Sequence, residues 1–287
     1  MAVRSPLTWL GGKYNQASHI ISLFPSHDHY IEVFGGALHV FMRKEPIILE
    51  TINDKYREVI NFWLACRDHS EELMRKIDWT PYSRALMTEW RNAPEPDDPI
   101  ERAARWFYVH SACVNSCWHS SWSRQKRRSD INVPAGERFR RRVDRILAMR
   151  DRLAHVQIEC LDFREMIEHY GDCESNLMYL DPPYVGSEKE YEEVFTEQDH
   201  LDLAEMLHEM KAKAVLSYGD DPLTAKLYKD WVSKKVIVTR QCAPAMEKRP
   251  KATEVIYMNY VLQPELFSYP ASEVCNDPEN PVESYQD

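Results

Sequence analysis

The amino-acid sequence predicts an α/β fold built on a mostly parallel sheet. Short apolar or alternating runs recur along the chain, as is typical of strands, and a stretch with helical spacing separates two of them. A helix between successive strands implies parallel pairing, with helices on the faces of the sheet. Hydrophobic residues make up 44% of the 287 residues and aromatic residues 11%, which supplies a sizeable core and excludes global disorder.

The apolar runs define the predicted strands. Five of them cover residues 30–34, 47–49, 156–160, 177–180 and 214–218. Two later runs, at residues 236–238 and 255–261, are expected to close the sheet as an antiparallel hairpin. Residues 196–214 predict an amphipathic helix, because Thr196 and Asp199 are spaced like a capping box.

The sequence also predicts a division into three parts. Residues 1–54 and 145–270 carry the strand pattern and are assigned to one sheet domain. Residues 55–144 show helical spacing and few strand signals, which indicates an inserted helical region. Residues 271–287 contain Pro, Glu, Asp and Asn and few apolar residues, so we expect an acidic, disordered tail there.

The net charge of −10 argues by itself against a nucleic-acid partner, because neutralising phosphate requires Lys and Arg. The charge is unevenly distributed, however: residues 124–152 contain eleven basic and four acidic residues, a local charge of +7 that leaves −17 on the remainder. Charges beyond a Debye length of about 8 Å are largely screened, so this basic segment can bind phosphate on an acidic protein. The alternative is a solvated helix face, which is the more common explanation of an isolated charge run.

Other sequence features concern the cellular location, the cysteines, metal binding and the oligomeric state. No run approaches the roughly 18 apolar residues of a membrane span and the N-terminus lacks a signal-peptide core, so we expect a cytoplasmic protein without a membrane partner. Seven scattered cysteines without a CxxC pair predict free thiols. His110, Cys113, Cys117 and His119 fit no standard zinc spacing, so no metal is expected. The protein is expected to be a monomer or a weak dimer.

The tetrapeptide Asp181, Pro182, Pro183 and Tyr184 directly follows the predicted strand 177–180, at the edge where parallel sheets place ligand sites. Two prolines cannot continue a helix, so they predict a rigid turn with exposed carbonyl groups. A carboxylate and a carbonyl can accept the two hydrogens of a planar amine while an aromatic ring stacks on its heterocycle. An ordinary proline turn after a strand is the alternative.

Two glycine pairs occur near the N-terminus. The first lies in WLGGK at residues 9–13, but a Walker loop would need Gly at position 7 and Ser or Thr at position 14, where this chain has Leu7 and Tyr14. This excludes the nucleoside triphosphatase interpretation. Residues 32–41 predict a strand, a glycine turn and a helix, which permit the close backbone approach that a nucleotide cofactor needs. Asp54 follows the next strand and can either bond ribose hydroxyls or cap a helix.

Taken in order, these motifs resemble the Dam-type, D12-class family of DNA adenine N6-methyltransferases along nearly the whole chain. The matching elements are WxGGK at 9–13, the glycine motif at 32–38, an acidic stretch at 53–62, NVPxG at 132–136, DPPY at 181–184 and R-x-K-x-x-E with NY at 249–260. The resemblance implies a Rossmann-like, S-adenosylmethionine-dependent methyltransferase sheet with an inserted helical DNA-recognition region. The partner it implies is double-stranded DNA, with adenine N6 as the methyl acceptor.

The resemblance also implies roles for individual residues. The cofactor S-adenosylmethionine would be bound by Trp9, Gly12, Lys13, Phe34, Gly36, Asp54, Asp162, Phe163 and Asp181. As catalytic residues, Asp181 and the Pro182 carbonyl would hold the target amine while Tyr184 stacks on the base. A base in a duplex cannot reach such a pocket and must be flipped out at a cost of a few kcal/mol, which stacking of about 1–3 kcal/mol can offset.

DNA contacts are implied around the NVPAG element. The residues concerned are His119, Trp122, Arg124, Lys126, Arg127, Arg128, Asn132 and Pro134. Arg124 would bond a guanine edge bidentately, and the basic residues that follow it would contact phosphates. Trp118 and Trp122 are either wedges into the duplex or core residues.

Two departures from the family pattern lie in the glycine motif, where Val33 replaces a proline and Leu38 replaces the last glycine. They predict a cofactor loop of a different shape. The alternatives that remain open are methylation of cytosine N4, methylation of RNA, and a DNA-binding protein of the same fold with lost or weak catalysis.

Overall fold

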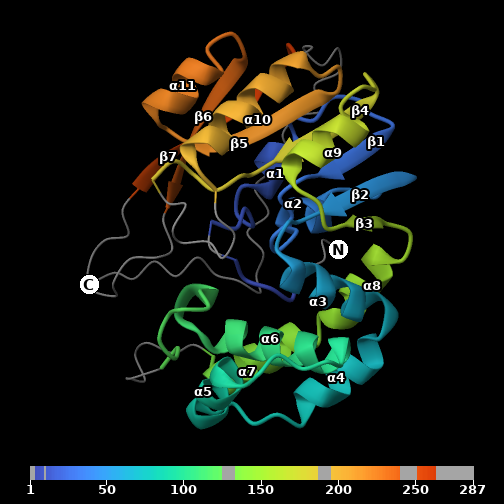
Figure 1. The fold of residues 1–287 in the computed structure, drawn as a ribbon, viewed down its shortest axis with the longest axis vertical. Helices are drawn as coiled ribbons and strands as arrows, with labels where there is room; N and C mark the ends of the chain where they lie inside the picture. The colour runs from blue at the N-terminus through green and yellow to red at the C-terminus, as the bar shows by residue number, and fades with distance from the viewer. Residues whose placement is uncertain (1–3, 10, 125–132, 187–194, 240–250, 263–287) are drawn as a thin grey trace.

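The computed structural model describes residues 4–9, 11–124, 133–186, 195–239 and 251–262 (Figure 1). Its strands are β1 (His29–Glu32), β2 (Leu49–Asn53), β3 (Gln157–Glu159), β4 (Asn176–Leu180), β5 (Lys213–Gly219), β6 (Val232–Thr239) and β7 (Lys251–Met258). Within the described residues they form one seven-stranded sheet of order β3-β2-β1-β4-β5-β7-β6. The first five strands pair in parallel, and β7 lies antiparallel between β5 and β6. The predicted tail, residues 271–287, lies outside the described residues.

Most of the predicted strands are confirmed. Four of the predicted runs coincide with β1, β3, β4 and β5, and the closing antiparallel hairpin is formed by β6 and β7. The prediction of a strand at residues 47–49 is wrong in position, because β2 begins at Leu49 and continues to Asn53. The polar residues Thr51 and Asn53 interrupt the apolar pattern of β2, yet both are buried and their side chains are hydrogen-bonded at the sheet.

One face of the sheet packs against helices from the second half of the chain. These are α9 (Phe163–Tyr170), α10 (Glu197–Glu209) and α11 (Pro222–Leu227). Because successive strand residues point to opposite faces, Ile31 and Met178 lie on this side, in a hydrophobic cluster with residues of α9 and α10. The predicted helix after residue 196 is confirmed by α10, where Thr196 and Asp199 form the capping box.

The opposite face joins the sheet to a helical layer, drawn in the lower half of Figure 1. This layer consists of α3 (Arg57–Asp68), α4 (Ser70–Asp78), α5 (Arg84–Asn92), α6 (Pro99–Ala112), α7 (Ala135–Val143) and α8 (Ile146–Leu153). Two shorter helices, α1 (Ala17–Ile21) and α2 (His39–Arg43), lie closer to the strands. Tyr30 and Leu177 of the sheet share one cluster with this layer, in which Phe62 of α3 stacks on Phe107 of α6 at 4.9 Å between ring centroids. None of the helices in the described segments combines the length and apolar composition needed to cross a membrane.

The turn between β1 and α2 contains a leucine in a conformation that favours glycine. Leu38 has φ +56° and ψ +35°, in the left-handed region that usually costs a residue with a side chain about 1–2 kcal/mol. Its side chain is 1% exposed, and full burial of a leucine contributes about 1.5–3 kcal/mol. Leucine is therefore accommodated at this position of the glycine motif because burial offsets the backbone strain.

Replacing Leu38 with Gly is expected to lower the free energy of unfolding by about 1–3 kcal/mol, because the loss of a buried side chain outweighs the relief of strain. Urea denaturation measures the change. Leu38→Ala is the matched control: it loses nearly the same side chain but keeps the strain, so it should be about 1 kcal/mol less stable than Leu38→Gly. An alanine variant as stable as the glycine variant would show that the backbone at residue 38 is unstrained.

Candidate active site

Four neighbouring strands end at one pocket, on the carboxyl edge of the sheet where parallel α/β folds bind ligands. Because the sheet order is β3-β2-β1-β4, the residues that follow these strands line the pocket in the same order. They are Asp162 after β3, Asp54 after β2, Gly36 after β1 and Asp181 after β4. The pocket therefore extends along the sheet edge from Asp162 at one end to Asp181 at the other.

At the Asp181 end of the pocket, the buried ammonium group of Lys13 contacts the Asp181 carboxylate. Lys13 Nζ lies 2.8 Å from Asp181 Oδ1 and donates to the Gly11 carbonyl at 2.9 Å, and the Lys13 side chain is 4% exposed. The same ammonium lies 4.9 Å from the ring centroid of Tyr184. The structure thus brings together Lys13, Asp181 and Tyr184, and Pro183 lines the pocket beside them, while Pro182 is buried in the turn.

Two carboxyl groups near this end have raised pKa values. Burial raises the pKa of Asp181 to about 6, although the Lys13 ammonium opposes the rise. Burial also raises the pKa of Glu32 to about 8, against hydrogen bonds donated by the Tyr30 hydroxyl at 2.6 Å and the Phe41 N–H at 3.0 Å. Glu32 lines the pocket but is not among the residues predicted from sequence, although a carboxylate at the end of a buried strand is itself a signal.

An aromatic stack connects the pocket to the helical layer. The Trp9 ring stacks on His110 at 5.1 Å, and His110 stacks on Trp106 of α6 at 4.9 Å between ring centroids. Trp9 also packs over Gly36, whose φ is +47° and where an added Cβ would lie 2.9 Å from the indole nitrogen. A Cβ at Gly12 would lie 2.8 Å from the His39 ring, so both glycines are required for this close packing.

Asp54 organises the middle of the pocket. One carboxylate oxygen accepts the Gly36 N–H at 2.7 Å and the other accepts the Tyr56 N–H at 2.8 Å. The side chain therefore holds the glycine turn and the chain entering α3 together. The expected role of Asp54 as a helix cap is not confirmed, because Tyr56 is the N-cap of α3 and Asp54 bonds the N–H of Tyr56 instead. A bond from Asp54 to ribose stays a prediction.

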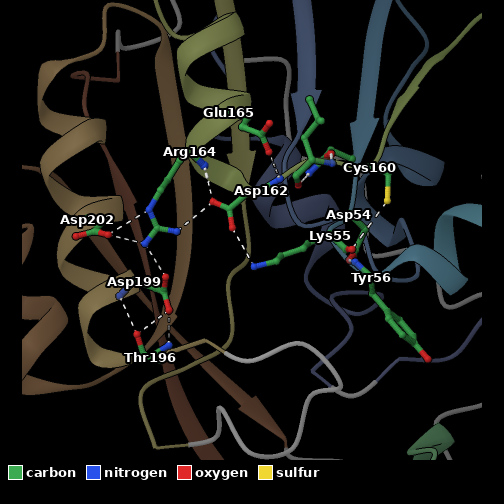
Figure 2. Close-up of polar contacts among 12 residues, drawn as sticks. Asp54, Lys55, Tyr56, Cys160, Asp162, Arg164, Glu165, Thr196, Asp199 and Asp202 are labelled. Carbon is green, nitrogen blue, oxygen red and sulfur yellow. Dashed lines mark hydrogen bonds and ion pairs between the residues drawn. The ribbon is translucent and has the colours of Figure 1, made fainter.

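The Asp162 end contains a network of charged side chains, shown in Figure 2. Asp162 is the N-cap of α9, and one of its oxygens accepts from the Arg164 N–H at 3.0 Å and the Arg164 guanidinium at 3.1 Å. The other oxygen lies 3.0 Å from Lys55 Nζ. Arg164 also pairs with Asp199, at 2.6 Å, and Asp202, both of α10. Lys55 and Asp199 line the pocket but were not predicted from sequence, because their only signal is proximity in space.

Aromatic rings form an apolar wall beside this network. Phe34 and Phe163 lie 6.1 Å apart, and Phe195 lies 5.9 Å from Phe34 and 5.7 Å from Phe163, measured between centroids. All three line the pocket. Phe34 and Phe163 are among the residues predicted from sequence. Phe195 belongs to none of the sequence motifs, because it lies well beyond the DPPY turn, just before α10.

Four of the residues predicted to contact DNA lie in the described part of the chain, and none of the four lines the pocket. His119 and Arg124 are exposed, as is Pro134, which is the N-cap of α7. Trp122 is partly buried and packs on Tyr82 with ring centroids 4.4 Å apart, which favours the core interpretation of this tryptophan over the wedge.

Part of the predicted DNA surface lies outside the described residues, namely Lys126, Arg127, Arg128 and Asn132. Elsewhere in the basic segment, three arginines have carboxylate partners within the chain, in the pairs Arg141–Glu137, Arg150–Asp151 and Arg152–Glu50. Glu137 and Asp151 are already counted in the local charge of +7, so only the pair of Arg152 with Glu50, which lies outside the segment, offsets part of that charge. The described residues contain no group of three or more His, Cys, Asp or Glu side chains arranged to hold a metal ion.

Comparison with known proteins gives a family match over most of the chain. A family model described as D12 class N6 adenine-specific DNA methyltransferase matches residues 9–242. The type II methyltransferase M1.LlaDCHI of Lactococcus lactis subsp. cremoris is 27% identical over 278 residues, covering 88% of this chain and 94% of that protein. The DNA adenine methylase of Serratia marcescens is 23% identical over 278 residues, covering 88% and 97%.

The ionisation of Asp181 provides a test of the pocket geometry. The Asp181 carboxyl is expected to titrate at about pH 6 rather than near its ordinary value, and Lys13→Met should move the titration to higher pH because it removes the neighbouring positive charge. Carboxyl ¹³C chemical shifts followed against pH measure both values, and Asp181→Asn identifies the signal. A carboxyl that titrates at the same pH with and without Lys13 would contradict the contact.

Proposed function

Since the chain belongs to the D12 class of N6 adenine-specific DNA methyltransferases, we propose that it transfers a methyl group from S-adenosylmethionine to adenine N6 at a specific site in duplex DNA. The target base is flipped out of the helix to reach the pocket, because an amine inside a base pair is inaccessible to a methyl donor. The cofactor, when bound, supplies an electrophilic methyl group on a sulfonium centre.

The order of residues along the sheet edge carries this proposal. In Rossmann-type sheets, an acid after the second strand bonds the ribose hydroxyls, and here that acid is Asp54. β2 lies between β3 on one side and β1 with β4 on the other. With the ribose at Asp54, the adenine of the cofactor would extend toward Asp162 and its methionine part toward Asp181.

The pocket lining fits these parts chemically. The Asp162 end offers a wall of Phe34, Phe163 and Phe195 for a heterocycle, together with polar groups at its edge. The other end offers Asp181, whose carboxylate suits the positive charge of a sulfonium or an amino group. Trp9, Gly12 and Gly36 would line the methionine part.

Methyl transfer to an amine requires an in-line approach of the nitrogen lone pair, so the main contribution of the protein is orientation. Lys13 supports a nitrogen-binding role for the DPPY turn, because its ammonium is held by Asp181 and faces the Tyr184 ring. We infer that the target amine donates to Asp181 and the Pro182 carbonyl in the same way, with its ring stacked on Tyr184. Hydrogen bonds to both amine hydrogens favour a pyramidal nitrogen, which is the more nucleophilic form.

The DNA partner would be held by the segment that follows α6. We propose that the exposed Arg124 reads a base edge and that Lys126, Arg127 and Arg128 contact phosphates, with His119, Asn132 and Pro134 nearby. The name of the Lactococcus relative, a type II methyltransferase, supports the further proposal that this chain is the modification enzyme of a restriction–modification pair.

Incubation with methyl-labelled S-adenosylmethionine and an adenine-containing duplex is expected to place the label in N6-methyladenine. Asp181→Ala should abolish transfer, because it removes an acceptor for the target amine, while circular dichroism should show a largely retained fold. Tyr184→Ala should raise KM for DNA more than KM for the cofactor. Label in cytosine, label in RNA alone, or no transfer to any nucleic acid would contradict the proposal.

The DNA contacts divide into two kinds that substitution separates. Arg124→Ala should cost about 1–3 kcal/mol of binding energy and relax the preference at one base pair, because it removes a bidentate base contact. The double substitution Arg127→Ala and Arg128→Ala should weaken binding to all sequences alike and flatten the slope of log affinity against log salt concentration. An unchanged slope would mean that other residues contact the phosphates, with Lys248, Arg249 and Lys251 as the next candidates.

A further inference from the structure

Five arginines from three segments of the chain converge where the sheet meets the helical layer. They are called here the arginine row and consist of Arg4, Arg43, Arg138, Arg142 and Arg145. Arg43 belongs to α2, beside the strands, whereas Arg138 and Arg142 belong to α7 of the helical layer (Figure 1). The arginine row therefore extends from one layer of the protein to the other.

On the sheet side, an aromatic ring and a backbone carbonyl hold the arginines together. The guanidinium carbons of Arg4 and Arg43 lie 5.0 Å and 5.6 Å from the centroid of the Tyr14 ring. Arg145, the N-cap of α8, donates to the carbonyl of Ser5 at 3.3 Å, directly beside Arg4 in the chain. Arg145 thus connects the N-terminal segment to the helical layer.

On the helical side, the arginines follow one face of α7. Arg138 and Arg142 are four residues apart and so lie one above the other on the helix surface. Arg142 is partly buried and donates to the carbonyl of Ser111 at 3.5 Å, near the end of α6. Arg145 follows three residues later, so the positive charges continue without a break to the sheet side.

The arginine row lacks acidic partners. Among the described residues, none of its five members forms an ion pair with a carboxylate, whereas Arg141, Arg150 and Arg152 of the same segment all do. Asp144 contributes an attractive charge to Arg145 but is not ion-paired with it. The chain has 46 acidic and 36 basic residues, so carboxylates are not scarce. Their absence from the row is a local feature that leaves its positive charge available.

This arrangement is electrostatically unfavourable in the free protein. Burial, together with the charges of Arg138 and Arg145, lowers the pKa of Arg142 to about 10. Burial and the charge of Arg4 likewise lower the pKa of Arg145. Both guanidinium groups stay charged at neutral pH, so they repel their neighbours, and an anion bound among them would relieve the repulsion.

The arginine row also passes close to the pocket. Burial and nearby cations that include Arg145 lower the pKa of His39, a residue of the pocket lining, to about 4. Burial and the charge of Arg142 lower the pKa of His110, whose ring stacks on Trp9 of the pocket lining. Arg142 and Arg145 are therefore near enough to act electrostatically on the pocket wall and on the residue stacked behind it.

We propose that the arginine row binds backbone phosphates of the DNA strand whose base enters the pocket. A flipped nucleotide stays covalently attached to the phosphates on its two sides, so these phosphates come to lie beside the pocket. Guanidinium groups match phosphate oxygens in charge and in geometry. The inference rests on the proposed function, and it adds a phosphate-binding surface to the one proposed at residues 126–128.

Stabilisation of helix ends is the competing explanation of these arginines. Arg142 lies in the last turn of α7 and Arg43 in the last turn of α2, where positive charge interacts favourably with the helix dipole. This explanation does not apply to Arg4, which precedes α1, or to Arg145, which lies at the start of α8. It also does not explain why side chains from three segments converge.

The salt dependence of DNA binding tests the proposal. Fluorescence anisotropy of a labelled duplex, measured at several salt concentrations, gives the slope of log affinity against log salt concentration. Arg142→Gln should weaken binding about tenfold and reduce the slope by about 1, because one phosphate contact is lost. Arg142→Lys keeps the positive charge and should keep most of the slope. The double substitution Arg4→Gln and Arg43→Gln, which changes less buried positions, should reduce the slope by about 2.

Arg150→Gln is the matched control, because Arg150 lies in the same basic segment but is exposed and paired with Asp151. It should keep the wild-type slope. Calorimetry with S-adenosylhomocysteine should give the wild-type affinity for every variant, and thermal melting checks that each is folded.

Two outcomes would overturn the proposal. Wild-type slopes in both the Arg142→Gln protein and the Arg4 and Arg43 double variant would show that the arginine row does not bind phosphate, while methyl transfer to adenine by the same proteins would leave the proposed function intact. A wild-type protein that binds no duplex DNA would overturn the proposed function and this inference with it.

Discussion

Parallel pairing of β1 with both β2 and β4 is the constraint on which the site depends. Because parallel strands end at the same edge, residues separated by more than a hundred positions in the chain become neighbours around one pocket. The extension of the sheet to β3 brings Asp162 to the same edge. The order of strands in the sheet thus sets the order in which Asp162, Asp54, Gly36 and Asp181 line the pocket.

Burial of carboxyl groups at this edge disfavours their ionised form, and the cations that oppose this effect differ between the two ends of the pocket. Asp181 is countered by a single buried ammonium, Lys13, and its pKa remains raised by burial. Asp162 is countered by two cations, Arg164 and Lys55, and its pKa is lowered. One end therefore has a carboxyl that titrates within reach of neutral pH, and the other has a permanent acceptor.

The helical layer is joined to the sheet by the hydrophobic core rather than by a flexible connection. The Trp9, His110 and Trp106 rings stack in series, so the residue that packs over the Gly36 turn also contacts α6. Burial lowers the pKa of His110 to about 3, which keeps its imidazole uncharged within the stack. Trp9 therefore links α6 to the Gly36 turn at the wall of the pocket.

The local features of this protein were determined by the sequence itself. The strands β1, β3, β4 and β5, the capping box of α10 and the turn motifs could be predicted because alternation, capping and proline geometry act over a few residues. Such local signals cannot give the position of β2. Thr51 and Asn53 are polar, and their burial becomes favourable only through hydrogen bonds to distant segments.

Only the tertiary structure decided which side chains share the pocket. The contacts of Lys13 with Asp181 and of Lys55 with Asp162 join segments about a hundred or more residues apart, and no local periodicity encodes such pairs. The backbone conformation of Leu38 likewise cannot be predicted from local sequence. A leucine disfavours the left-handed conformation, and only burial of its side chain in the assembled core stabilises it. Long-range packing outweighs local propensity at these positions because the free energy of burial is available only once the whole sheet has formed.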